Sequence, residues 1–155
     1  MGIERGLLAT QGYIELGMPV EALAELERLP AAEREREEVL QLRLFILMHG
    51  RKWAEAVEAC ERLRELFPEG STGFIHGAFC LHELGRTSEA KHLLLSGPAY
   101  LSREATYFYN LGCYDAVLGN IDEATAALRT SFEMDKKFRE IAKYDPDLKS
   151  VSDLL

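Results

Sequence analysis

The sequence predicts an all-α fold, a right-handed α-solenoid of about four helix-turn-helix repeats with a C-terminal capping helix. Two observations lead to this prediction. Apolar residues recur at the three- and four-residue spacing of amphipathic helices along most of the chain. Small residues also recur at an interval of 34 positions, at Ala22, Ala56, Ala90 and Ala124. A fixed period of this length is typical of a solenoid of repeated helical units.

The first repeat, residues 3–36, is the least regular of the four. A helix is expected from Ile3 to Leu16, ending before Gly17. Pro19 suits the first turn of the next helix, because the N–H that proline lacks has no helical partner there. That second helix is expected from Val20 to about Leu29.

The second repeat, residues 37–70, follows the same plan. Its first helix is expected to end at His49-Gly50, with Gly50 as the turn residue. Its second helix is expected from Trp53 to Phe67, with the apolar side chains on one stripe.

The third and fourth repeats cover residues 71–104 and 105–138. Thr87 is the expected N-cap of the second helix in repeat three, because its hydroxyl can accept a backbone hydrogen bond. Asn120 and Glu123 predict a capping box at the second helix of repeat four, in which both side chains bind backbone N–H groups.

The tail, residues 137–155, is expected to act as a cap. A solenoid must cover the apolar face of its last repeat, and the tail offers apolar side chains for this, namely Phe138, Ile141, Ala142, Leu148 and Val151. No linker rich in Gly, Ser or Pro interrupts the chain. We therefore expect a single domain over residues 1–155.

The net charge of −8 disfavours two classes of partner. An acidic surface repels phosphate backbones and anionic lipid, so neither nucleic acid nor a membrane is expected.

The longest apolar run, Leu44–Met48, is too short to span a bilayer. The chain start lacks signal-peptide features, and three cysteines without CxxC spacing favour reduced thiols. These features predict a cytoplasmic protein, but they specify neither its oligomeric state nor its partner.

The fourth repeat carries a characteristic set of large and small residues. They are Phe108, Leu111, Gly112, Gly119, Ala124, Leu128 and Ser131. In this the repeat resembles the tetratricopeptide repeat (TPR), a 34-residue helix-turn-helix unit. The resemblance covers roughly residues 3–136 and implies a TPR protein that acts as a protein–protein interaction scaffold or adaptor.

In the TPR family, four positions of each first helix line a concave groove, which implies a peptide-binding surface here. Its predicted members in repeats two to four are Gln41, Phe45, Met48, Ile75, Phe79, His82, Tyr109 and Cys113. The Lys and Asn residues with which some members grip a terminal carboxylate are largely missing from the matching positions. The expected ligand is therefore a short, mostly apolar segment of another protein or peptide. Alternatively, Phe45 and Phe79 pack between repeats as ordinary core.

Two other functions stay open. Small TPR chaperones of bacterial type III secretion are of similar size and shield an apolar segment of a client. A metal- or thiol-dependent site would instead use His76, Cys80, His82 and Cys113, although paired zinc ligands at tight spacing are missing. No Ser-His-Asp order, phosphate-binding glycine loop or HExxH motif occurs. We therefore expect no enzyme activity, no cofactor and no bound metal.

Asp115 departs from the family pattern, because it stands where the family usually has a large apolar residue. A buried carboxylate needs hydrogen-bond partners. We expect Asp115 to bond a neighbouring helix rather than to act as a functional acid.

Overall fold

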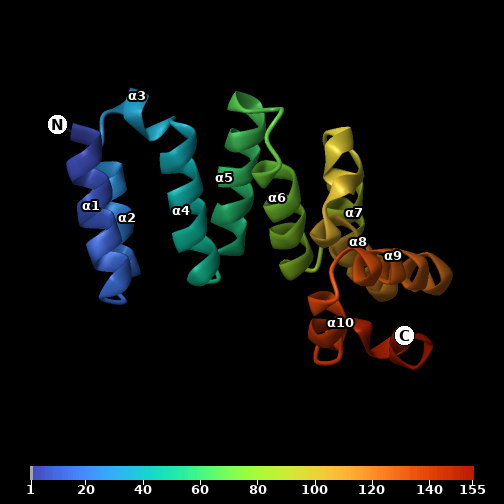
Figure 1. Ribbon diagram of the computed structural model, residues 1–155. Helices are drawn as coiled ribbons and strands as arrows, with labels where there is room; N and C mark the ends of the chain where they lie inside the picture. Colours follow the sequence, from blue (N-terminus) through green and yellow to red (C-terminus); the bar gives the residue numbers. More distant parts are fainter. Residues whose placement is uncertain (1) are drawn as a thin grey trace. The chain divides into compact units, whose positions relative to one another are not determined.

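The computed structural model describes residues 2–155 and confirms the all-α prediction. The described residues form helices and no strand (Figure 1). The α-helices are α1 (Gly2–Glu15), α2 (Pro19–Glu27), α3 (Ala31–Arg34), α4 (Glu37–His49), α5 (Trp53–Leu66), α6 (Thr72–Glu83), α7 (Thr87–Leu95), α8 (Ala105–Val117), α9 (Ile121–Met134) and α10 (Lys137–Ala142). Two 3-10 helices are η1 (Ala99–Arg103) and η2 (Pro146–Leu154). Within residues 2–155, no helix combines the length and apolar character that crossing a membrane requires.

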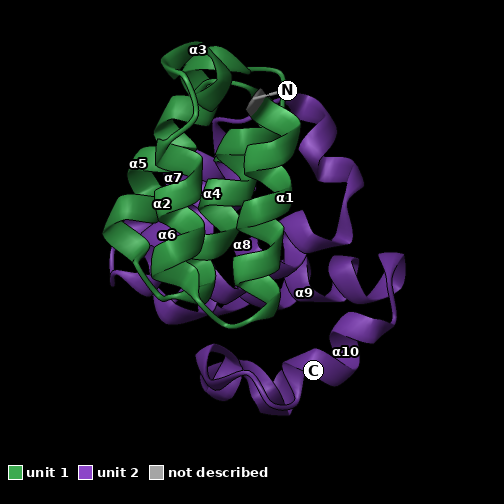
Figure 2. Cartoon of the chain, turned by 90° about the vertical axis from the view of Figure 1, so that its left-hand side faces the viewer, with its two compact units in different colours: residues 1–73 green, residues 74–155 purple. Residues whose placement is uncertain are grey.

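The chain divides into two compact units, residues 1–73 and 74–155 (Figure 2). In the first unit, α1 packs against α2, and α4 packs against α5. Buried apolar side chains of α2 and of Leu29 pack against those of α4. They are Ala22, Leu26, Leu29, Val39 and Ile46. The single-domain assignment of residues 1–155 stays a prediction.

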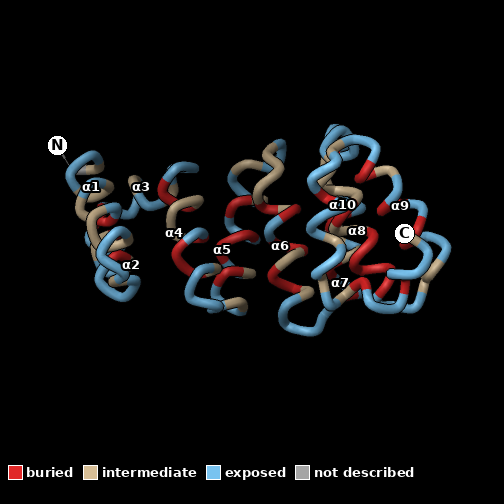
Figure 3. Tube along the Cα trace, turned by 60° about the horizontal axis from the view of Figure 1, so that its bottom comes forward, coloured by how far each residue is buried: buried red, intermediate tan, exposed pale blue. Residues whose placement is uncertain are grey.

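In the second unit, α8 packs along α9, and α7 contacts α8. The tail returns to this pair, because η2 contacts both α8 and α9 and α10 contacts α9. Phe138, Leu148 and Val151 are buried there, whereas Ile141 is 46% exposed and does not join the cap. Buried segments of α8 are visible in Figure 3. The tail therefore covers the apolar surface of the last helix pair, as a cap must.

The repeat register follows from the small residues. Ala22, Ala56, Ala90 and Ala124 are all 0% exposed. Gly112 serves the same close packing, because a Cβ added to it would lie 2.6 Å from Cγ of Leu128. Only a small side chain fits where paired helices approach this closely.

One turn position has the same left-handed backbone in every repeat. Its residues, again 34 apart, are Gly17, Arg51, Gly85 and Gly119, with φ of 70°, 56°, 79° and 85°. Glycine adopts this conformation readily, whereas a residue with a Cβ is strained. Gly50 lies in the turn after α4, as expected, with φ −82°, and the left-handed residue of this turn is Arg51, which follows it.

Both predicted side-chain caps were wrong. Thr87 is the first residue of α7 rather than its N-cap, and its hydroxyl bonds Nδ1 of His82 at 2.9 Å. Asn120 does stand at the N-cap of α9, but its side chain makes no cap hydrogen bond. Its Nδ2 instead donates to Oδ1 of Asp115 at 2.9 Å. The side chains of Thr87 and Asn120 thus bond to His82 and Asp115 of the preceding helices instead of to backbone N–H groups.

The structural role expected for Asp115 is confirmed. Its buried carboxylate accepts hydrogen bonds from Nζ of Lys91 at 2.7 Å and from Asn120. Asp115 therefore ties α8 to α7 on one side and to the turn before α9 on the other. The positive charge of Lys91 compensates the carboxylate of Asp115, which therefore has a structural role.

Candidate peptide-binding surface

In the first unit, the predicted groove residues all lie on α4. Gln41 is half-buried, and its amide donates to Oε1 of Glu37 at 3.1 Å and to Oγ1 of Thr72 at 3.3 Å. Met48 is also half-buried. Phe45 is 46% exposed. A large aromatic side chain with this exposure is available for contact with another molecule.

Phe45 borders an apolar pocket of about 290 Å³ where the α1–α2 turn meets the end of α4. The pocket is lined by Ile14, Gly17, Met18, Pro19, Phe45, Ile46, His49 and Gly50. The ring of His49 lies 4.1 Å from that of Phe45, and its Nδ1 contacts the Phe45 carbonyl oxygen at 3.2 Å. The His49 ring therefore packs against the Phe45 ring at the rim of the pocket.

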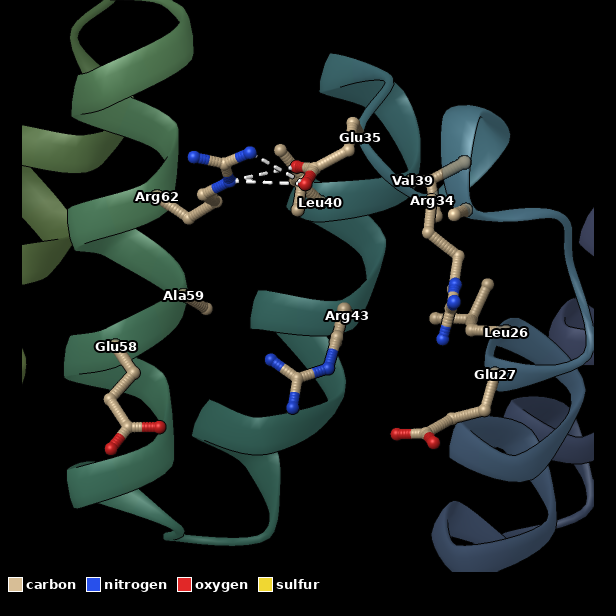
Figure 4. Close-up of a pocket in the computed structure, with 11 residues that line it drawn as sticks. Leu26, Glu27, Arg34, Glu35, Val39, Leu40, Arg43, Glu58, Ala59 and Arg62 are labelled. Carbon is tan, nitrogen blue, oxygen red and sulfur yellow. Dashed lines mark hydrogen bonds and ion pairs between the residues drawn. The ribbon is translucent and has the colours of Figure 1, made fainter.

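A second pocket of about 340 Å³ in the same unit has mixed charge. Figure 4 shows its arginine and glutamate side chains on α2, α3, α4 and α5 and on the turn after α3. Arg62 is held there by Glu35, with N–O distances of 2.7 to 3.1 Å. The predicted groove residues do not line this pocket. Because its arginines and glutamates balance, it shows no preference for an anion or a cation.

In the second unit, the predicted groove residues are largely covered. Ile75, Tyr109 and Cys113 are buried, and Phe79 and His82 are half-buried. The chain's own tail covers part of this surface, which the sequence did not predict. The ring of Phe138 from α10 lies 5.0 Å from that of Tyr109.

Two tail aspartates hold three of the predicted groove side chains. Tyr109 donates from its hydroxyl to Oδ2 of Asp145 at 2.6 Å, and Cys113 donates from Sγ to the same oxygen at 3.6 Å. Nε2 of His82 lies 2.7 Å from Oδ2 of Asp147. Since a carboxylate only accepts hydrogen bonds, Nε2 of His82 carries a proton. The structure thus brings His82, Tyr109 and Cys113 together around the tail.

The environment raises the pKa of both Tyr109 and Cys113. Burial raises the pKa of the Cys113 thiol, and the nearby charges of Asp145 and Asp147 raise it further. Burial also raises the pKa of Tyr109, as does its hydrogen bond to Asp145. Both groups are therefore neutral donors at neutral pH. A thiolate nucleophile, which needs a lowered pKa, is not formed at Cys113.

The alternative metal or thiol site is not assembled as the sequence suggested. Among residues 2–155, the group of potential metal ligands within 4.8 Å of one another is Cys113, Asp145 and Asp147. His76 and Cys80 do not belong to this group. The sequence Asp-Pro-Asp at 145–147 indicates the end of a helix. No local pattern predicted that its carboxylates would contact residues of α6 and α8.

Comparison with solved structures places this fold among known helical repeats. The chain is similar to a MamA fragment from Desulfovibrio magneticus RS-1, with TM-score 0.78 and 17% identity over 97% of this chain and 87% of that one. It is also similar to TTC0263, a thermophilic TPR protein of Thermus thermophilus, with TM-score 0.71 and 19% identity over 96% and 85%. This chain has a TPR-type fold. No protein-family model and no curated protein matches the sequence.

Proposed function

We propose that this TPR-type chain is a protein-interaction scaffold that holds a short, mostly apolar segment of another protein. The observation that carries the proposal is the apolar pocket beside the exposed Phe45, on a helical-repeat fold. Helical repeats of this kind expose extended surfaces that bind other proteins. In this proposal the protein is a cytoplasmic adaptor without enzyme activity, and residues 1–155 work as one domain.

The proposal includes the predicted groove residues of each unit. In the first unit these are Gln41, Phe45 and Met48 on α4. In the second they are Ile75, Phe79, His82, Tyr109 and Cys113 on α6 and α8. The pocket beside Phe45 takes one aliphatic or aromatic side chain of the ligand. Burying such a side chain contributes about 1.5–3 kcal/mol, which corresponds to about a tenfold to hundredfold gain in affinity.

The test starts from peptides selected on the wild-type protein from a random display library. We expect the selected peptides to be rich in aliphatic and aromatic residues. Their affinity is then measured by fluorescence anisotropy for wild type, for Phe45→Glu and for the control Leu95→Glu. Leu95 lies on α7 and is 52% exposed, close to the 46% of Phe45. Phe45 is a better site for this test than half-buried Phe79, where a charge would also disturb packing.

We expect Phe45→Glu to weaken binding at least tenfold, because a carboxylate at the rim of an apolar pocket is poorly solvated by the bound ligand. Leu95→Glu should leave the affinity unchanged, and circular dichroism should give the same helicity for all three proteins. Equal affinities for wild type and Phe45→Glu would remove this pocket from the function.

A further inference from the structure

Residues 144–155 of the tail are attached to the second unit by side-chain hydrogen bonds and by buried aliphatic side chains, and Arg129 also donates to the Leu154 carbonyl oxygen at 3.0 Å. Asp145 and Asp147 accept hydrogen bonds from Tyr109, Cys113 and His82, on α8 and α6. These donors are a phenol, a thiol and an imidazole, and the two acceptors are two positions apart in sequence. The surface thus holds two carboxylates that are two positions apart in sequence.

Two aliphatic side chains of the tail complete the attachment. Leu148 is 1% exposed and Val151 is 0% exposed, on a segment that contacts α8 and α9. Tyr144 and Leu154, at either end of this segment, are exposed. Within residues 144–155, the side chains that make the attachment are therefore two aspartates, a leucine and a valine.

The conformation of η2 indicates that its contacts with α8 and α9 stabilise it. η2 is a 3-10 helix of nine residues, whereas 3-10 helices longer than three or four residues are uncommon because their hydrogen bonds are poorly aligned. The side chain of Asp145 accepts from the backbone N–H of Asp147 at its start. A segment with so little helical stability of its own is held mainly by its contacts.

We propose that the α6–α8 surface of the second unit is a binding site for acidic–aliphatic segments of the pattern Asp-Pro-Asp-Leu-x-x-Val, and that residues 144–155 are its internal, displaceable ligand. The occupant is a partner segment of this chemistry, since the bound tail displays the chemistry that the surface accepts. A partner competes with a tail that is tethered at a high effective concentration. The less often the tail leaves the site open, the weaker is the apparent affinity of the partner. This inference goes beyond the proposed function, because it gives the groove residues His82, Tyr109 and Cys113 a ligand with carboxylates, and it does not depend on the Phe45 pocket.

The experiment uses the full chain and a fluorescent peptide with the sequence of residues 144–155. Anisotropy gives the affinity for wild type and for a tail-weakened double variant, Leu148→Ala with Val151→Ala. The peptide is also made with asparagine in place of Asp145 and Asp147. Adding Tyr109→Phe to the tail-weakened chain removes one donor of the surface while keeping the ring.

We expect the peptide to bind the tail-weakened chain at least tenfold more tightly than wild type, because the internal competitor is weaker. The asparagine peptide and the Tyr109→Phe chain should each lose at least fivefold in affinity. If the double variant loses helicity, the single variant Asp147→Asn replaces it, since this change weakens the tail without a cavity.

Three results would overturn the proposal. They are no saturable binding to the folded tail-weakened chain, the same affinity for wild type and tail-weakened protein, or the same affinity for the aspartate and asparagine peptides. Phe45→Glu in the tail-weakened background should leave the affinity for the tail peptide unchanged. Failure of the Phe45 pocket as a ligand site is therefore distinguishable from failure of the tail site.

Discussion

Arg51 provides the sharpest test of the repeat geometry. It occupies the turn position at which the other three repeats have glycine, and its φ of 56° is left-handed. The side chain is exposed. Replacing Arg51 by glycine should therefore stabilise the protein, because it relieves backbone strain and removes no buried contact.

The magnitude follows from two opposing terms. A left-handed residue with a Cβ costs roughly 1–2 kcal/mol in the folded state, and glycine removes this cost. Glycine also makes the unfolded chain more flexible, which costs about 0.4–1 kcal/mol of stability. The net expectation for Arg51→Gly is a gain of about 0.5–1 kcal/mol, or a rise in Tm of roughly 1–4 °C for a chain of 155 residues.

Gly17→Ala is the matched control, since Gly17 occupies the same turn position in the same unit. A Cβ at Gly17 would meet no atom within 4 Å, so only its left-handed backbone, with φ of 70°, opposes the substitution. We expect Gly17→Ala to lower Tm while Arg51→Gly raises it, as measured by thermal and urea unfolding followed by circular dichroism. If Arg51→Gly lowers Tm, or Gly17→Ala raises it, strain at this turn does not govern stability.

Two further substitutions test the packing of the second unit. Gly112→Ala should destabilise by about 1–3 kcal/mol relative to Gly12→Ala, because both gain helix propensity but only Gly112 would overpack, against Leu128. Urea unfolding measures both, and equal stabilisation by the two alanines would contradict the close α8–α9 crossing. Asp115→Asn should cost about 1.5–3 kcal/mol, the typical loss when a charged hydrogen bond is broken, here the bond to Lys91. A Tm equal to that of wild type would show that this ion pair adds no net stability.

The helix pairs were predictable because their causes are local and repeated. The buried alanines recur every 34 residues, and helix ends such as Gly17 and Gly119 coincide with left-handed turns. Each repeat thus carries its own evidence for helix, turn and helix. The left-handed backbone of Arg51 was not predicted, because arginine rarely adopts this conformation, although the 34-residue interval from Gly17 marks the position.

The candidate site was less predictable because it depends on contacts between distant parts of the chain. The sequence selected Tyr109 and Cys113 for the surface but treated Asp145-Pro146 only as a break. Asp147 reaches His82 across 65 positions, and helical periodicity carries no information on such a pairing. The caps failed for a related reason, since Asn120 had a carboxylate partner in Asp115 that competes with the backbone.

The three cysteines give this protein built-in reporters of local opening. Cys60 lies in the first unit, Cys80 and Cys113 lie in the second, and all three are buried. A small alkylating reagent reaches each thiol only when the surrounding helices separate. Brief exposure to such a reagent, followed by mass spectrometry, would therefore record how often each unit opens without any introduced label.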